Sequence, residues 1–204
     1  MRRWGKVPRR IQGNEGRENM REIASRGQLR LAFLRWAVVT VPFILLLGFA
    51  SARLAPTGSE NPWFMRLIKP EIMPPGYAFP IAWTVLYVLM GLALAMIINA
   101  RGSTLRGPAL VVFAVQMAVN LTWSPVFFGM HLVVPALIII GVMFVLALAT
   151  TILFARIRMG AALLLIPYLA WICFAGYLLF QINELNPNAA SLVPSRSADQ
   201  IQIH

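Results

Sequence analysis

Charged residues are scarce in this chain, and they are almost absent from its apolar segments. Asp, Glu, Lys and Arg make up 12% of the 204 residues, hydrophobic residues make up 59%, and the mean hydropathy is +0.71. Soluble domains carry about a quarter charged residues, so this composition predicts an integral membrane protein. Apart from Arg35 and Arg53, at the two ends of the first apolar run, no charged residue lies inside a run. Proton-coupled transport and general acid–base catalysis need titratable groups, so we expect neither within the membrane.

Acidic residues are few as well, with seven against eighteen lysines and arginines, which gives a net charge of +11. A basic balance can indicate nucleic-acid binding, but half of these cations lie in residues 1–30 and most others flank apolar runs. This distribution is typical of membrane topology, and we expect no nucleic-acid partner. The single cysteine, Cys173, excludes an intrachain disulfide and a cysteine-based zinc site, and its apolar surroundings predict a buried thiol. His131 lies in a short connection, where a turn residue is expected rather than a haem ligand.

Long apolar runs are what the chain does possess. A helix that spans a bilayer needs about 20 apolar residues, and each run is near that length. Because lipid offers no partners for backbone N–H and C=O groups, each run should be helical. The sequence therefore predicts an all-α membrane protein, a bundle of five transmembrane helices. The runs cover residues 36–52, 77–100, 108–129, 132–155 and 159–182.

The polar segments predict how the chain is divided. Residues 1–30 are expected to form a basic, partly disordered cytoplasmic tail, residues 31–187 the transmembrane domain, and residues 188–204 a short polar C-terminal tail. Three connections between the runs are short, but the connection at residues 56–75 is long and rich in proline. Loops of this length are usually functional or disordered. Since this one carries several large apolar side chains, we expect it to be ordered.

Lysine and arginine also predict the orientation of the chain. Five spans place the termini on opposite sides, with thirteen cations in the segments on the side of the N terminus and four in the segments on the other side. Cytoplasmic segments carry the excess of positive charge, so the N terminus should be cytoplasmic and the long connection should face the opposite side. The acids among residues 1–30 do not suit a mitochondrial targeting peptide. A bacterial inner membrane fits this pattern.

Aromatic and amide residues recur at helical spacing in three of the runs. Intervals of three and four place each set on one face of its helix. An indole N–H or carboxamide deep in a bilayer needs a partner, and both core packing and a ligand satisfy that need. Phe79, Phe127 and Tyr168 also suit an interfacial aromatic belt. The sets are Phe79, Trp83 and Tyr87, then Gln116, Asn120, Trp123 and Phe127, then Tyr168, Trp171, Ala175, Leu178 and Ile182.

Three segments of the chain resemble a known family when they are taken together and in order. They are "NPWFMRLIKPEIMPPGYAFPIAWTVLYVLMG", "QMAVNLTWSPVFFG" and "PYLAWICFAGYLLFQINELNP". They resemble the TspO/MBR family, which includes the tryptophan-rich sensory protein of bacteria and the translocator protein (peripheral benzodiazepine receptor) of mitochondria. The resemblance extends from about Trp36 to Pro187. It implies a five-helix bundle, usually a homodimer, with a ligand pocket open toward the long first connection.

The resemblance also implies which residues form that pocket. Three positions depart from the family pattern: Ile72 stands where Trp is usual, Leu179 where Asn is usual, and Phe64 where Tyr is common. We expect these departures to shift the preference for ligands. The implied ligand-binding residues are Trp63, Phe64, Pro74, Phe79, Trp83, Tyr87, Asn120, Trp123, Ser124, Trp171, Ala175 and Leu178.

The function that this resemblance implies is a membrane receptor or sensor. Family members bind porphyrins and haem-related tetrapyrroles, and the animal members also bind cholesterol, so we expect a flat apolar ligand such as porphyrin or haem and no required cofactor. The expected partners are the lipid bilayer and a second copy of the chain. Two alternatives remain open, a transporter of tetrapyrroles or sterols and a light-dependent porphyrin-degrading enzyme. The enzyme would rely on the photochemistry of its ligand, because no catalytic pair or metal site is expected.

Overall fold

The computed structural model describes residues 26–193, and the elements in that range are all helical. Five helical segments are long and apolar enough to cross a membrane, which confirms the predicted five-helix fold. A bilayer enforces this choice, because an apolar segment in lipid satisfies its backbone groups only as a helix. The long helices are α2 (Arg26–Ala52), α4 (Ala78–Ile98), α5 (Arg106–Ser124), α6 (Val133–Ile157) and α8 (Ile166–Leu185). Shorter ones are η1 (Gly58–Glu60), α3 (Pro62–Arg66), the π-helical turn η2 (Pro125–Gly129), α7 (Met159–Leu163) and η3 (Ala189–Leu192).

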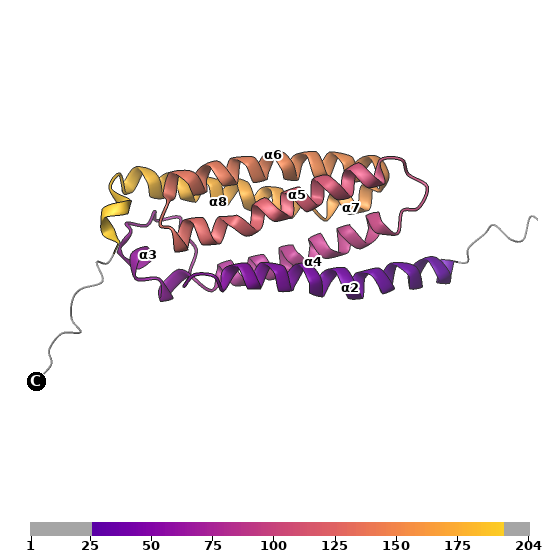
Figure 1. Cartoon of the computed structure of the whole chain (residues 1–204), viewed down its shortest axis with the longest axis horizontal. Coiled ribbons are helices and arrows are strands. Elements are labelled where there is room, and N and C mark those ends of the chain that lie inside the picture. The colour runs from indigo at the N-terminus through magenta and orange to yellow at the C-terminus, as the bar shows by residue number, and fades with distance from the viewer. Residues whose placement is uncertain (1–25, 194–204) are drawn as a thin grey trace, which may run out of the picture.

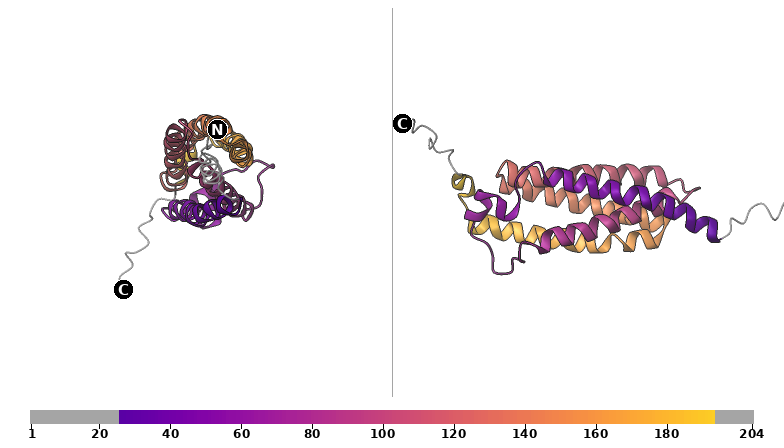
Figure 2. Two further views of the ribbon diagram at one scale, coloured as in Figure 1. Left: turned by 90° about the vertical axis from the view of Figure 1, so that its right-hand side faces the viewer. Right: turned by 90° about the horizontal axis from the view of Figure 1, so that it is seen from below.

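The long helices lie around a common axis, as the end-on view in Figure 2 shows. Helix α2 packs against α4 and also contacts α5, α5 packs against α6, and α6 packs against α8 and α7. Helix α7 returns to α4, so the contacts close a ring. The connection with α3 lies at one end of this bundle, and the short connection between α4 and α5 lies at the other (Figure 1). We call these the loop end and the basic end.

Two glycines permit the close contact between α2 and α4. A Cβ added at Gly91 would lie 2.7 Å from the Cα of Val41, so the two backbones meet there without a side chain between them. A Cβ added at Gly48 would lie within the ring of Tyr87, at 2.1 Å from its nearest carbon. The hydroxyl of Thr40 donates to the backbone oxygen of Gly91 at 2.8 Å and links the same two helices. Small residues of this kind bring membrane helices together where lipid provides no hydrophobic drive.

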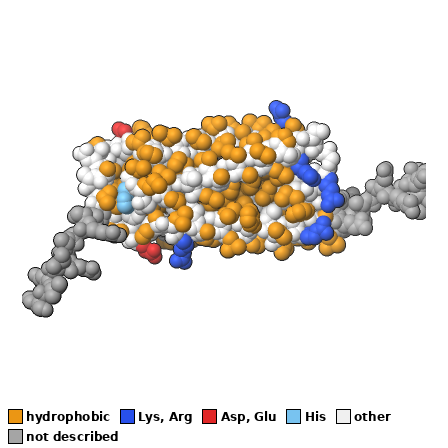
Figure 3. Space-filling model, viewed as in Figure 1, with side chains coloured by type: hydrophobic (Ala, Val, Ile, Leu, Met, Phe, Trp, Pro, Cys, Tyr) orange, Lys and Arg blue, Asp and Glu red, His pale blue; other side chains and the backbone are white. Residues whose placement is uncertain are grey.

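The outer surface of the bundle suits lipid. Many large apolar side chains of all five spans are exposed, and hydrophobic atoms cover much of the face in Figure 3. Cys173 lies on this outer surface and is exposed. The predicted burial of its thiol is therefore wrong, because an apolar run in a membrane helix has a lipid-facing side as well as an inner side.

The described chain includes part of each predicted terminal segment. Helix α2 begins at Arg26, and the rest of the predicted basic tail lies outside the described residues. At the other end, η3 extends the fold to Leu192, and Ala189 is buried against the loop end. The chain after the fifth span therefore contributes to the structure that surrounds the long connection.

Candidate functional site

The long connection after α2 is ordered, as predicted, and Asn61 fixes its first half. The side-chain oxygen of Asn61 accepts from the backbone N–H of Phe64 at 3.0 Å and so caps helix α3. Its amide nitrogen donates to the backbone oxygens of Pro56 and Phe128, both at 2.9 Å. One buried side chain therefore holds the connection against η2, and its hydrogen bonds satisfy both ends of the buried amide.

Residues after the fifth span hold the second half of this connection. Asn186 accepts from the backbone N–H of Ile68 at 2.8 Å and donates to the backbone oxygen of the same residue at 2.9 Å. Trp63 is fully buried, and its indole N–H donates to the backbone oxygen of Ala189 at 2.8 Å. The loop end is thus closed by contacts between segments that are more than a hundred residues apart. Sequence spacing gave no signal for Asn186 or Ala189 in this role.

An aromatic wall lines the space between α4 and α8 below this connection. Phe79 and Trp171 meet edge to face with their centroids 6.0 Å apart. One turn further along α4, the ring centroid of Trp83 lies 5.2 Å from that of Tyr87 and 6.4 Å from that of Tyr168. Trp83 and Trp171 are only partly buried, and within residues 26–193 neither indole N–H has a hydrogen-bond partner. The wall therefore presents large aromatic faces that the core does not fully cover.

A buried polar network lies beside this wall. The hydroxyl of Tyr87 donates to the side-chain oxygen of Asn120 at 3.1 Å, and the amide nitrogen of Asn120 lies 3.0 Å from the hydroxyl oxygen of Tyr168. Gln116 donates to that same oxygen at 2.8 Å. The network joins α4, α5 and α8, so Asn120 has the interhelical partners that a polar group in a membrane needs. Spacing had placed Gln116 and Tyr168 on inner faces, but the site prediction did not include them.

A second aromatic cluster lies at the loop end, beside η2. Trp63, Phe64 and Trp123 each contact Phe127, and Trp123 stacks on it with a centroid distance of 5.2 Å. The indole nitrogen of Trp123 and the hydroxyl of Ser124 are buried without a hydrogen-bond partner. Unpartnered buried polar atoms are uncommon in proteins. Within residues 26–193, these are the two fully buried polar atoms of the predicted set that have no partner.

The predicted site residues thus fall into distinct places. Phe79, Trp83, Tyr87, Asn120 and Trp171 come together at the wall and its network. Trp63, Phe64 and Trp123 belong to the loop-end cluster, which Ser124 adjoins on α5. The predicted belt position is wrong for Phe127 and Tyr168, which are 2% and 1% exposed, because both rings turn into the bundle. The remaining predicted residues are Pro74, partly buried in the connection, and Ala175 and Leu178, partly and fully buried on α8.

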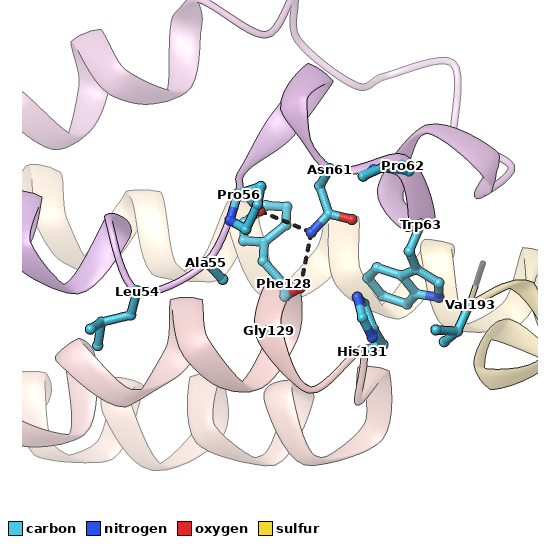
Figure 4. A pocket seen from close by; sticks show the side chains of 10 residues that line it. All are labelled: Leu54, Ala55, Pro56, Asn61, Pro62, Trp63, Phe128, Gly129, His131 and Val193. Atoms are coloured by element: carbon cyan, nitrogen blue, oxygen red, sulfur yellow. Dashed lines mark hydrogen bonds between the residues drawn. The ribbon is translucent and has the colours of Figure 1, made fainter. Parts of the chain in front are cut away.

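A pocket of about 380 Å³ opens at the loop end, outside the aromatic wall. Figure 4 shows Asn61 on one side of the pocket, with its hydrogen bonds to Pro56 and Phe128. The rings of Trp63 and His131 lie next to each other on another side. Val193 closes the pocket near the end of the described chain. His131 adopts a positive φ of 59° in the turn before α6, as expected for a tight turn residue. The aromatic residues of the wall do not line this pocket.

Comparison with known proteins identifies the family. Residues 38–185 match the model of the TspO/MBR family. A tryptophan-rich sensory protein from Cereibacter sphaeroides is 39% identical over 155 residues, which cover 74% of this chain and 96% of that protein. The tryptophan-rich protein TspO of Chlorobaculum tepidum is 38% identical over 144 residues, with 70% and 90% covered. The translocator protein of Bos taurus is 33% identical over 150 residues, with 71% and 88% covered. The chain is therefore an integral membrane protein of the TspO/MBR family.

Proposed function

We propose that this protein is a membrane receptor that holds a flat, mostly apolar ligand, a porphyrin or a related tetrapyrrole, against the wall between α4 and α8. The observation that carries the proposal is the pair Trp83 and Trp171, whose rings lie in the bundle but are only partly covered. Offset stacking and edge contacts with a π-system add about 0.5–1.5 kcal/mol for each ring beyond area burial. A tetrapyrrole offers one large π-face to both rings, and a sterol offers a flat apolar face of similar shape.

The unpartnered polar groups of the loop-end cluster support a ligand with acceptors at its edge. Trp123 and Ser124 contribute two buried donors that have no partner in the described chain. A ligand oxygen or nitrogen at this place would remove the cost of leaving such donors unpaired, which is about 1–3 kcal/mol for each group. Porphyrins and sterols both carry an acceptor at the periphery of a flat skeleton.

Cations at the loop end support a ligand that carries carboxylates. Lys69 lies 4.9 Å above the ring of Phe64, and its ammonium group is 3.4 Å from the backbone oxygens of Met65 and Leu67. Arg66 has a similarly long contact of 3.4 Å with Leu192. These contacts are weak, so either side chain can turn toward a propionate at the mouth of the site without losing a strong bond. An ordered connection lowers the entropy that binding must overcome.

The names of the relatives agree with a protein that senses or moves a ligand. One is called a sensory protein, and another is called a translocator protein. We extend these descriptions to this chain only as far as ligand recognition. The site contributes aromatic faces and hydrogen-bond donors, and both can bind a ligand. Separate assays distinguish binding of the ligand from its transport and from its degradation.

A porphyrin titration tests the proposal. Purified full-length protein in detergent is titrated with protoporphyrin IX, and binding is followed by tryptophan quenching and by the porphyrin absorbance. Replacing Trp83 and Trp171 together by Leu should weaken binding by roughly 5- to 150-fold, from the loss of about 0.5–1.5 kcal/mol at each ring. The matched control is Trp36→Leu at the basic end, which should bind as the unchanged protein does.

Two results would contradict this proposal. One is the absence of saturable binding by the unchanged protein, and the other is equal affinity in the double variant and the Trp36→Leu control. The same titration with a sterol competitor decides whether sterols share the site. Porphyrin absorbance is followed in the dark and under light, which distinguishes binding from light-dependent degradation. Porphyrin flux into liposomes that contain the protein distinguishes binding from transport.

We also propose a homodimer that packs through the outer face of α5. Ala114, Ala118 and Thr122 follow one another at intervals of four on this helix, and all three are exposed. Small residues at this spacing let two membrane helices approach closely. Replacing Ala118 by Leu should convert the dimer to monomer in light scattering of the detergent-solubilised protein, and a dimer that survives this change would place the interface elsewhere.

We propose that the basic end faces the cytoplasm and that the protein resides in a bacterial inner membrane. Arg101, Arg106, Arg156 and Arg158 lie at the basic end, whereas Arg53, Arg66 and Lys69 lie at the loop end with Glu60 and Glu71. This charge difference supports the orientation through the positive-inside rule. Labelling of a cysteine introduced at Ser103 or at Thr57, with a reagent that does not cross membranes, reports the side on which each end lies. Labelling of the Ser103→Cys variant in intact cells would show that the basic end faces outward, and it would contradict the proposed orientation.

A further inference from the structure

A second hollow lies at the basic end of the bundle, far from the aromatic wall. Its volume is about 750 Å³, which is within the range of small-molecule sites in proteins. It lies where α2, the end of α4 and the start of α5 meet. The proposed porphyrin site is at the other end of these helices, so this hollow has no part in that function.

The hollow is positively charged. Arg101 and Arg106 both line it, together with Ser103 in the short connection between α4 and α5. Arg106 donates to the backbone oxygen of Ile98 through one nitrogen at 3.4 Å, and its other guanidinium donors have no partner within residues 26–193. The guanidinium fork fits the oxygens of a phosphate with two parallel hydrogen bonds.

The acidic residues of the described chain do not neutralise this charge. Glu60 lies in η1, Glu71 lies in the long connection, and Glu184 lies in the last turn of α8, all at the loop end. Figure 3 shows blue side chains gathered at the opposite end of the molecule. An anion that entered the hollow would therefore meet cations without a competing carboxylate from residues 26–193.

The apolar part of the hollow favours a lipid over a soluble anion. Trp36 and Leu110 line it from α2 and α5, and Trp36 is only partly buried. Tryptophan commonly lies at the level of lipid headgroups, where one part of its ring is apolar and its N–H is wet. On the same face of α2 as Trp36, and further into the membrane, Val39 and Phe43 are exposed by 58% and 55%, where an acyl chain can lie.

We propose that this hollow binds the phosphate of an anionic membrane lipid, with Arg101 and Arg106 holding the phosphate and Trp36 covering the glycerol region. The phosphate supplies the chemistry that the two guanidinium groups recognise. The bilayer supplies the lipid at the depth of this hollow, because the spans of α2, α4 and α5 all end there. Anionic headgroups attract basic residues near the membrane surface.

Native mass spectrometry of the full-length protein in a neutral detergent tests this site. The protein is titrated with dioctanoyl phosphatidylglycerol and, separately, with dioctanoyl phosphatidylcholine, and the bound lipids are counted. We expect one tight site that prefers phosphatidylglycerol. Replacing Arg101 and Arg106 by Gln should weaken that site by roughly 30-fold, since each basic residue near an anionic headgroup contributes about fivefold.

The matched control removes two other arginines on the same side of the membrane. Arg156 lies in the last turn of α6 and Arg158 between α6 and α7, both outside the lining of the hollow, so the change of both to Gln should leave the tight site intact. All four arginines lie at the ends of helices, and equal thermal unfolding of both variants checks the fold. Equal weakening in the two double variants would overturn the proposal, because it would show that general charge attraction accounts for binding.

A soluble phosphate ester separates the two sources of phosphate. Glycerol phosphate is added in competition with dioctanoyl phosphatidylglycerol, at concentrations around the affinity of the lipid. We expect little displacement, because the ester lacks the acyl chains that contact α2. Displacement by an equal concentration of glycerol phosphate would overturn the assignment to a lipid.

Discussion

Removing the hydroxyl of Tyr168 tests whether the buried polar network stabilises the bundle. Tyr168 is 1% exposed, and its oxygen lies 2.8 Å from the amide of Gln116 and 3.0 Å from the amide of Asn120. In Tyr168→Phe, both amides lose this acceptor, and the amide nitrogen of Asn120 retains only its 3.5 Å contact with the sulfur of Met143. Interhelical hydrogen bonds in membranes contribute about 0.6 kcal/mol each on average and up to about 1.7. For two bonds we expect the free energy of unfolding to fall by about 1–3 kcal/mol.

The assay is an unfolding titration with dodecyl sulfate in mixed micelles, followed by far-ultraviolet circular dichroism. Tyr177→Phe is the control, because Tyr177 lies on the same helix and its hydroxyl accepts from Gln181 on the exposed side. Surface changes of this kind are usually within about 0.5 kcal/mol. Combining Tyr168→Phe with Gln116→Leu should recover part of the loss, since the second change removes a donor left without an acceptor. Equal losses in Tyr168→Phe and Tyr177→Phe would refute the stabilising role of the network.

Three further predictions follow from close contacts and exposed positions. Gly91→Ala should lower the free energy of unfolding by about 1–3 kcal/mol in the same titration, because its Cβ would lie 2.7 Å from the Cα of Val41 and force α2 from α4. Asn186→Ala should speed limited proteolysis of the long connection while the helical content stays constant, because Ile68 loses both of its backbone partners. Ile72→Trp should tighten porphyrin binding by roughly 2- to 10-fold through an added aromatic face, with little change in stability because this position is 55% exposed.

Matched controls make these three results specific. Gly141→Ala adds a methyl group inside α6 where nothing lies within 4 Å, so it should not lower the free energy of unfolding. Asn183→Ala removes an amide one turn before Asn186 and should not affect proteolysis of the connection. Ile81→Trp adds an indole at an exposed position of α4 and should not change porphyrin binding. A control that behaves as its partner variant does would contradict the corresponding prediction.

The fold followed from the sequence because the membrane leaves few choices. Each apolar run is near the thickness of a bilayer, and backbone groups in lipid pair only within a helix. The start of α4 agrees with its proline content, because Pro80 lies in the first turn of this helix, where a missing N–H costs little. The break between α7 and α8 was not visible in the pattern, since both sides of it are apolar and the fifth run continues through it.

The candidate site was predicted less completely than the fold. Helical spacing placed Trp83, Asn120 and Trp171 on inner faces, and the structure brings them to one region. Spacing left open whether Asn120 pairs with other helices or with a ligand. In the structure its oxygen accepts from Tyr87 on α4 and its nitrogen bonds to Tyr168 on α8, so the amide pairs with other helices through both of its ends.

The sequence by itself determined the class of protein, the five spans and the inner faces of three helices, because these depend on local hydropathy and on helical periodicity. Only the tertiary structure decided which faces meet. It buried Trp63 by joining its indole to Ala189, more than a hundred residues away, and it left Trp83 partly open although both are tryptophans of the same predicted pocket. Such outcomes depend on the order of the helices around the bundle and on close contacts such as Gly48 with Tyr87, which are absent from any single helix.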